Sequence, residues 1–145
     1  MNIRVGEKAE LDLVVEAVIN LMDKGYKIFL LSGDLGSGKT TLVQSVVRQL
    51  GVDESVSSPT FSLINAYESS RVGVIYHMDF YRLEKAADLV QIGLEEYLES
   101  GQPCFIEWPE IAADYFFPPY VQIAIAIDTN KIRNFNITTY DTVDA

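Results

Sequence analysis

The sequence predicts an α/β fold, a mixed β-sheet flanked by helices with antiparallel hairpins in the second half of the chain. Over the first 50 residues, segments with helical spacing of apolar residues alternate with short apolar runs typical of buried strands. Later, extended segments lie only a few residues apart, which favours hairpins over crossovers. The length of 145 residues and a hydrophobic content of 48% predict one domain spanning residues 1–145.

The first third of the chain is predicted to contain two strands and two helices. Apolar residues between Leu11 and Met22 recur with i, i+3, i+4, i+7 spacing, which indicates an amphipathic helix that ends at Gly25. Gly51 ends the second helix in the same way. In chain order, the expected elements are a strand at 2–5, a helix at 7–24, a buried strand at 26–32, a glycine-rich loop at 33–38 and a helix at 39–50.

The remainder of the chain is predicted to form hairpins around one further buried strand. A helical pattern between the hairpins is interrupted near Gly93. The expected elements are extended segments at 61–67 and 72–79, a helix at 84–98, a short buried strand at 103–107 and a last hairpin of 120–127 with 134–140.

Charge and cysteine content limit the class of protein. The chain has 11 basic and 21 acidic residues and a net charge of −10, so direct high-affinity binding of nucleic acid is disfavoured. A single cysteine, Cys104, excludes a disulfide within the chain and indicates a reducing compartment. No apolar run approaches the ~18 residues of a membrane-spanning helix, and the N-terminus is not a secretory signal. A cytoplasmic protein without a membrane partner is therefore expected.

The strongest motif is GDLGSGKT at residues 33–40, which satisfies the P-loop pattern G-x-x-x-x-G-K-[ST]. It follows a predicted strand and begins a predicted helix, as the P-loop of P-loop NTPases does. Gly36 and Gly38 let the backbone wrap closely around phosphate, with the helix N-terminus behind it. Lys39 would pair with the β and γ phosphates, and Thr40 would offer a hydroxyl to Mg²⁺. Thr41 could bond the α phosphate.

Hydrolysis would also need acidic groups, and two carboxylates follow apolar strands. Asp79 and Glu107 each end such a run, and either could hold Mg²⁺ while the other orients the attacking water. The alternative for each is a solvated or helix-capping carboxylate. Thr60, in the segment SSPT, stands where a switch loop could sense the γ phosphate, although a simple polar turn fits equally well. His77 is interpreted as a packed or hydrogen-bonded histidine rather than a base.

Four stretches together resemble the bacterial TsaE family, the small P-loop ATPases of tRNA threonylcarbamoyladenosine synthesis. In chain order they are GDLGSGKTT (33–41), SPTF (58–61), H-x-D-x-Y-R (77–82) and IEW (106–108). The resemblance covers roughly residues 3–127. The P-loop is shared by many NTPases, and the combination with the other three stretches is far more specific.

This resemblance implies binding of ATP or ADP with Mg²⁺, and association with a TsaD–TsaB pair through which tRNA is met indirectly. It also implies a role for each motif residue. Thr40 and Glu107 would ligate Mg²⁺, Asp79 would lie near the metal and the attacking water, and Thr60 would be the switch hydroxyl. The phosphates would be held by Gly36, Ser37, Gly38, Lys39, Thr40 and Thr41.

Two departures and two alternatives qualify the resemblance. The stretch after Glu107 (WPEIA, 108–112) lacks the basic residue that many members carry there. NKIR at 130–133 is similar to the GTPase N-K-x-D motif but ends in Arg133, so the guanine-reading carboxylate is missing; this favours ATP, and Arg133 is expected near the base or sugar.

A small-molecule kinase is a second hypothesis, disfavoured by the lack of an arginine cluster. A nucleotide-dependent interaction module with little hydrolysis is a third, which the sequence does not separate from the first.

Overall fold

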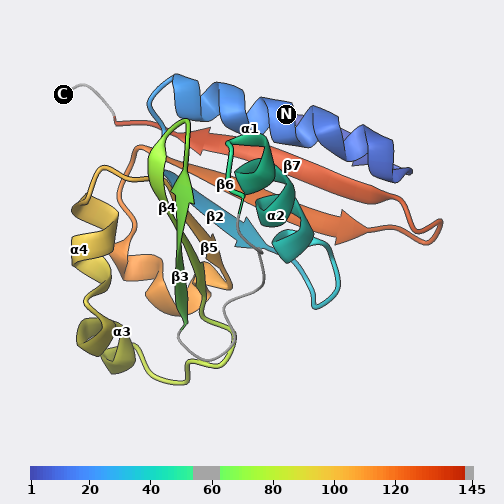
Figure 1. The fold of residues 1–145 in the computed structure, drawn as a ribbon. Helices are drawn as coiled ribbons and strands as arrows, with labels where there is room; N and C mark the ends of the chain where they lie inside the picture. The colour runs from blue at the N-terminus through green and yellow to red at the C-terminus, as the bar shows by residue number, and fades with distance from the viewer. Residues whose placement is uncertain (54–62, 143–145) are drawn as a thin grey trace.

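A computed structural model describes residues 1–53 and 63–142 of the chain (Figure 1). The strands are β1 (Asn2–Val5), β2 (Ile28–Ser32), β3 (Ile64–Ser69), β4 (Gly73–Asp79), β5 (Cys104–Glu107), β6 (Tyr120–Ile127) and β7 (Arg133–Tyr140). The α-helices are α1 (Leu11–Asp23), α2 (Lys39–Gln49), α3 (Ala87–Ile92) and α4 (Leu94–Glu99). Two 3₁₀ segments, η1 (Lys8–Glu10) and η2 (Pro109–Tyr115), complete the described elements.

The strands form one seven-stranded mixed sheet in the order β1-β7-β6-β2-β5-β4-β3. The four central strands are parallel, because β2 pairs in parallel with β5 and β6, and β5 pairs in parallel with β4. Antiparallel hairpins extend both sides, β3–β4 on one and β6–β7 on the other, and β1 adds antiparallel to β7. Parallel central strands end at the same edge of the sheet, so the residues that follow β2, β4 and β5 are brought together there.

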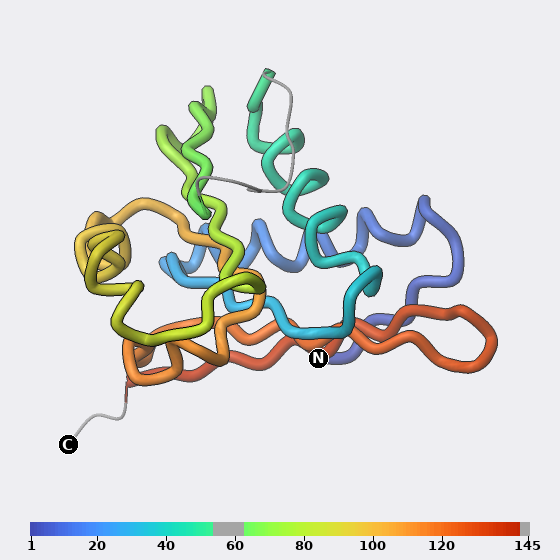
Figure 2. Tube along the Cα trace, turned by 90° about the horizontal axis from the view of Figure 1, so that it is seen from below, coloured from blue at the N-terminus to red at the C-terminus, as the bar shows by residue number. Residues whose placement is uncertain are grey.

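Both faces of the sheet are covered by helices, and alternation along β2 assigns the faces. Phe29 and Leu31 pack with α1 and α2 in one apolar cluster, whereas Leu30 packs with α3, α4 and η2 in the other. Figure 2 shows α1 and α2 on the same side of the long β6–β7 hairpin. This arrangement explains why β2 and β5 are apolar at nearly every position.

The predicted α/β fold with a mixed sheet is confirmed, and most elements lie where the sequence predicts them. Gly93 has φ 71° and separates α3 from α4, at the predicted interruption. The predicted helix at 7–24 is wrong at its start, because Lys8–Glu10 form a 3₁₀ turn before α1 begins at Leu11. Segment η2 was not predicted, and residues 61 and 62 lie outside the described part. In the described residues, no helix is long and apolar enough to cross a membrane.

Candidate functional site

The glycine-rich loop leaves the end of β2 and leads directly into α2. Gly36 and Gly38 have φ values of 78° and 111°, which residues with a Cβ rarely adopt. A Cβ at Gly33 would lie 2.7 Å from the Ile125 carbonyl oxygen and 2.7 Å from Ser37 Oγ. Glycine is therefore required for both the conformation and the close packing of this loop, and the N-terminus of α2 begins immediately after it at Lys39.

Lys39 is held against its own loop. The ammonium Nζ donates to the Gly33 carbonyl at 2.5 Å and to the Asp34 carbonyl at 3.1 Å, and it lies 4.2 Å from the ring centroid of Trp108. Burial lowers the pKa of Lys39 below its ordinary value of 10.5, while the nearby Glu107 carboxylate opposes that shift. The side chain is only 4% exposed, so this cation is already largely removed from bulk water.

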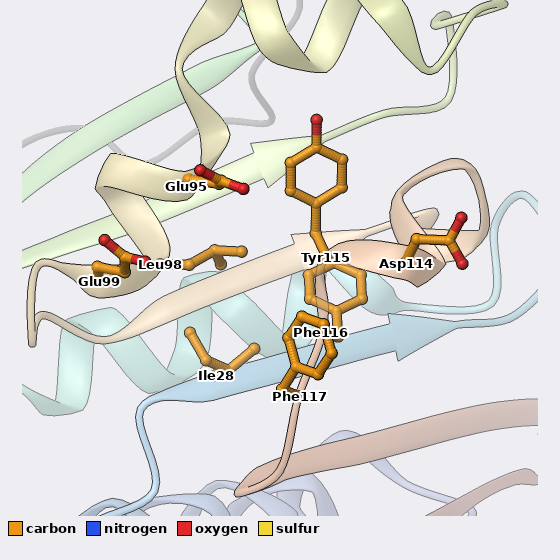
Figure 3. Close-up of a pocket in the computed structure, with 8 residues that line it drawn as sticks. All are labelled: Ile28, Glu95, Leu98, Glu99, Asp114, Tyr115, Phe116 and Phe117. Carbon is orange, nitrogen blue, oxygen red and sulfur yellow. The ribbon is translucent and has the colours of Figure 1, made fainter.

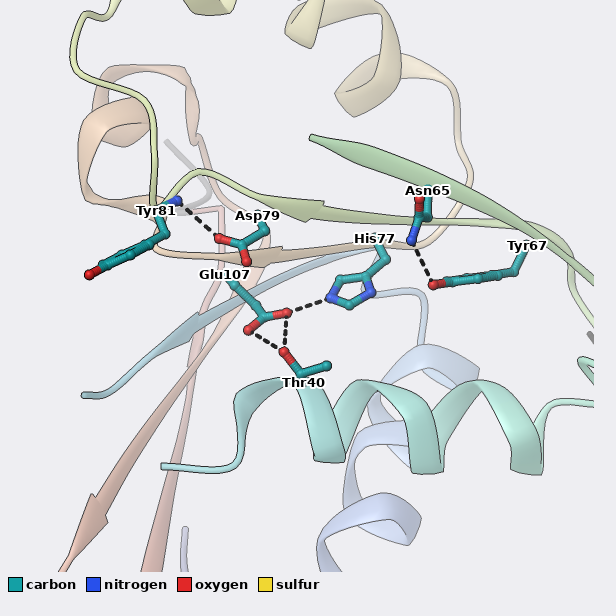
Figure 4. Close-up of polar contacts among 7 residues, drawn as sticks. All are labelled: Thr40, Asn65, Tyr67, His77, Asp79, Tyr81 and Glu107. Atoms are coloured by element: carbon teal, nitrogen blue, oxygen red, sulfur yellow. Dashed lines mark hydrogen bonds and ion pairs between the residues drawn. The ribbon is translucent and has the colours of Figure 1, made fainter. Parts of the chain in front are cut away.

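Thr40, Glu107 and His77 form a compact hydrogen-bonded group (Figure 4). The Thr40 hydroxyl lies 2.8 Å from Glu107 Oε1 and 2.9 Å from Oε2, and His77 Nε2 lies 2.6 Å from Oε2. Glu107 is 3% exposed and His77 is fully buried. The carboxylate at the end of β5 is thus directed at the first turn of α2, where a hydroxyl already meets it.

Asp79 lies beside Glu107 because the two residues are register partners at the ends of β4 and β5. Asp79 Oδ1 accepts a hydrogen bond from the Tyr81 backbone N–H at 2.9 Å, which turns the chain sharply after the strand (Figure 4). Asp79 does not cap a helix through this contact, because α3 begins only at Ala87. Both predicted carboxylates therefore reach the same edge of the sheet.

An open cleft of about 280 Å³ collects these groups. Its lining residues are Leu35, Gly36, Gly38, Lys39, Thr40, Thr41, Asp79, Tyr81, Glu107, Trp108 and Arg133. A second cleft of about 260 Å³ adjoins it and shares Gly38, Thr41 and Arg133 with it. Arg133 Nε donates to the Ser37 carbonyl at 2.9 Å, so the start of β7 is tied to the loop where the two clefts meet.

The structure brings together nearly all of the residues singled out in the sequence. Every predicted phosphate, metal and catalytic residue among those described lines the first cleft except Ser37, which is 2% exposed beneath the loop. The hydroxyl of Ser37 is buried without a hydrogen-bond partner among the described residues. Thr60 lies outside the described residues. The roles assigned to these residues stay predictions.

Sequence reasoning missed two groups of lining residues. Trp108 was weighed only as a core or partner-facing aromatic, yet it adopts a left-handed φ of 56° and stands over Lys39. Its position directly after Glu107 was the available signal. The second cleft is built partly from Val5, Gly6, Glu7, Lys8 and Leu11, and nothing in the sequence places these residues near residue 38. Their approach depends on β1 pairing with β7.

The donor set fits Mg²⁺ bound together with a phosphate. Mg²⁺ prefers hard oxygen ligands, is commonly held by one or two carboxylates and keeps several waters or phosphate oxygens. Thr40 and Glu107 present a hydroxyl and a carboxylate side by side. Among the described residues, no group of three or more His, Cys, Asp or Glu side chains is placed to hold a metal alone. Phosphate oxygens from a nucleotide on the loop would complete such a set.

Another groove, of about 310 Å³, lies away from this edge, where β2 begins at Ile28 (Figure 3). The rings of Tyr115, Phe116 and Phe117 line it together with the carboxylates of α4 and Asp114. None of its lining side chains is basic, so phosphate groups are not expected there. The chemistry predicted from the sequence belongs to the loop edge of the sheet.

A parallel strand, a glycine-rich loop and a helix that begins with lysine and threonine define a protein with a P-loop NTPase-like fold. The crystal structure of YdiB from Bacillus subtilis matches this chain with a TM-score of 0.73 and 27% identity, over 96% of this chain and 84% of that one. Residues 5–135 match the family described as "Threonylcarbamoyl adenosine biosynthesis protein TsaE". The chain belongs to the TsaE family, as the resemblance of its motifs predicts.

Individual relatives agree with the family match. The "tRNA threonylcarbamoyladenosine biosynthesis protein TsaE" of Rickettsia conorii is 40% identical over 106 residues, which are 72% of this chain and 59% of that protein. The protein of the same name from Bacillus subtilis is 37% identical over 111 residues, 77% of this chain and 68% of that protein. The matched segment thus spans less than two thirds of the R. conorii protein and, at 61%, of the Rickettsia felis protein.

Proposed function

We propose that this chain is a Mg²⁺-dependent ATP-binding and ATP-hydrolysing subunit for threonylcarbamoyladenosine modification of tRNA, working with a TsaD–TsaB-type complex. Membership of the TsaE family supports the pathway. Nucleotide binding is supported by one observation: Lys39, Thr40 and Glu107 line a single cleft together with the glycine-rich loop.

Phosphate binding would use the loop backbone, the N-terminus of α2 and Lys39. The ammonium now donates to the carbonyls of Gly33 and Asp34, two neutral acceptors. A phosphate oxygen is a stronger acceptor for a cation, so Lys39 is expected to exchange at least one carbonyl for phosphate. The loop glycines leave the cleft open to the approaching phosphates.

Thr40 and Glu107 would hold Mg²⁺, because they are the hydroxyl and carboxylate that already contact each other in this cleft. When bound, the cation supplies charge neutralisation at the phosphate oxygens. The Thr40 hydroxyl can turn away from Glu107 by rotation about one bond, which frees Oε1 to bind a cation. Glu107 itself is buried, and its Oε2 lies 2.6 Å from His77 Nε2.

Hydrolysis would break the bond between the γ-phosphorus and the bridging oxygen, with water as the nucleophile. Asp79 lines the same cleft and is the carboxylate proposed to orient that water and accept its proton. Thr60 is proposed as the hydroxyl that responds to the γ phosphate. Ser37, Gly38 and Thr41 would contact the remaining phosphates.

The nucleoside is proposed to occupy the second cleft, which adjoins the phosphate cleft at Arg133. Its walls include apolar side chains of Val5, Leu11 and Phe135, which suit one face of a base. The missing carboxylate at the end of NKIR favours ATP over GTP. Competition binding should therefore show ATP displacing a labelled adenine nucleotide at lower concentration than GTP does, and equal or tighter GTP binding would defeat this assignment.

The partner part of the proposal is tested by ATP turnover. Purified chain should hydrolyse ATP slowly alone and faster with the TsaD–TsaB pair, since partners often complete such sites. The net charge of −10 suits a subunit that meets tRNA only through its partners. Tight ATP binding with no turnover under either condition would favour the interaction-module hypothesis, and phosphoryl transfer to an added small molecule would favour a kinase.

A further inference from the structure

His77 is a buried histidine whose described polar contact leads into the proposed metal site. It lies on β4, two residues before Asp79, and its ring is fully buried. Its Nε2 lies 2.6 Å from Glu107 Oε2. Its other ring nitrogen, Nδ1, has no hydrogen-bond partner among residues 1–53 and 63–142.

A histidine needed only for packing would not be expected to make this arrangement. Burying a polar ring is costly unless it is hydrogen-bonded, and an apolar side chain of similar volume would fill the same space without an orphaned nitrogen. The ring instead makes one short bond, to the carboxylate proposed as the Mg²⁺ ligand. Among the described residues, the ring therefore has one bonded nitrogen, and that nitrogen meets a proposed site residue.

The bond also distinguishes the two oxygens of Glu107. A carboxylate only accepts hydrogen bonds, so His77 Nε2–H donates to Oε2. The hydroxyl of Thr40, itself a proposed ligand, lies 2.8 Å from Oε1 and 2.9 Å from Oε2, so among the described residues Oε1 has the Thr40 contact without the one from His77. If Thr40 turned to a cation, His77 would still hold Oε2, and Oε1 would be released from its described contact with Thr40.

We infer that His77 is a positioning residue: it fixes the Glu107 carboxylate so that Oε1 is presented to a divalent cation beside Thr40. The inference rests on the proposed function, because it gives a second residue to the same metal site. Groups that hydrogen-bond to metal ligands orient them, and their removal typically lowers metal affinity about 10- to 100-fold. His77 meets that description through one contact.

The test compares ADP affinity with Mg²⁺ and with EDTA, by calorimetry, in variants of the 145-residue chain. His77→Met keeps an apolar volume and removes the donor, and His77→Gln keeps an amide donor at nearly the distance of Nε2. His77→Met should raise the Mg²⁺ concentration for half-maximal tightening roughly 10- to 100-fold and leave ADP affinity in EDTA unchanged. His77→Gln should recover most of the Mg²⁺ response. Should His77→Met fail to fold, His77→Asn, whose amide is too short to reach Oε2, carries the same expectation.

Tyr67→Phe is the matched control. Tyr67 is a buried aromatic on β3 whose ring centroid is 6.3 Å from that of His77, and its hydroxyl accepts a hydrogen bond from Asn65 Nδ2 at 3.0 Å. This variant should keep the wild-type Mg²⁺ response. A wild-type response in His77→Met, or an equal loss of ADP affinity with and without Mg²⁺, would overturn the positioning role. If the wild-type protein itself binds ADP equally with Mg²⁺ and EDTA, the proposed metal site fails first, and His77 with it.

Discussion

Lys39 is the cation that the proposed phosphate site would use. Its ammonium is nearly buried, lies beside the Trp108 ring and is satisfied by two loop carbonyls. Burial lowers the pKa of Lys39 from 10.5, but the carboxylate of Glu107 opposes the shift and favours the charged form. A desolvated cation attracts phosphate more strongly than a solvated one does, because less water has to be displaced.

Lys39→Ala should abolish useful ATP binding. A hydrogen bond to a charged group contributes about 1.5–3 kcal/mol, so affinity should fall about 10- to 150-fold. Trp108 is the single tryptophan of the chain and lies 4.2 Å from this ammonium, so its fluorescence offers a direct readout of the titration. Affinity equal to that of the wild type would show that the loop is not the phosphate site.

The loop between β2 and α2 depends on the backbone conformation of its glycines. Gly38 has φ 111°, and a Cβ there would lie 3.4 Å from Arg133 Nε, the group that is bonded to the Ser37 carbonyl. A side chain at this position therefore strains the backbone, and its Cβ comes into contact with the arginine that ties β7 to the loop. Gly25 has a nearly identical φ of 108° with nothing within 4 Å of its Cβ position, far along the chain at the end of α1.

Gly38→Ala and Gly25→Ala should each lower the free energy of unfolding by about 1–2 kcal/mol, because both place a Cβ in the left-handed region. Only Gly38→Ala should also weaken nucleotide binding. Denaturant unfolding and ATP titration of both variants check this pair of expectations. Equal nucleotide affinities in the two variants would mean that the loop conformation does not matter for phosphate binding.

Local signals predicted the elements that depend on local sequence. The strand at 120–127, the break at Gly93 and the antiparallel β3–β4 pairing follow from alternation, glycine and short connections. The 3₁₀ turn at Lys8–Glu10 was not predicted from these signals. It forms where Glu10 Oε1 accepts hydrogen bonds from the backbone N–H groups of Gly6 and Glu7. A capping side chain of this kind tightens the chain without changing the apolar pattern.

The pairing of strands across the whole sheet determines two features that the sequence alone did not predict, the contact of His77 with Glu107 and the second cleft. Loop, strand ends and carboxylates were predictable as separate motifs, but the contact of His77 with Glu107 requires the parallel pairing of β4 with β5. The second cleft likewise requires β1 to pair with β7, which brings residues 5–11 beside the loop. Both pairings join segments distant in sequence, and no local pattern specifies such partners.

Cys104 reports on the integrity of the whole sheet, since it lies fully buried in the central strand β5. Burial raises the pKa of the Cys104 thiol to about 12, so the reactive thiolate is scarce in the native protein at pH 8. A thiol reagent should label Cys104 only as denaturant unfolds the chain, with a midpoint that matches the loss of circular dichroism. Rapid labelling without denaturant would contradict the described packing of β5.

The pKa of Cys104 also sets a direction for stability at alkaline pH. The unfolded thiol ionises near its ordinary pKa of 9.0, whereas the folded thiol stays protonated up to about 12. The folded state therefore binds more protons in that window, and this group lowers the free energy of unfolding as pH rises from 9.0 toward 12. Cys104→Ala should remove this contribution, which paired denaturant titrations at neutral and alkaline pH would measure.

We propose that β2, β5 and α2 converge on one Mg²⁺–nucleotide site in which Glu107 is a ligand. The most direct measurement is the affinity for ATP and ADP, with Mg²⁺ and with EDTA, of wild-type protein and of Glu107→Gln, alongside thermal unfolding. Glutamine keeps the shape of the side chain and removes its charge. We expect Glu107→Gln to fold, to bind nucleotide like the wild type in EDTA and to lose most of the Mg²⁺-dependent tightening, roughly tenfold or more. A variant that responds to Mg²⁺ as the wild type does would contradict the claim and make Asp79 the first candidate for the ligand.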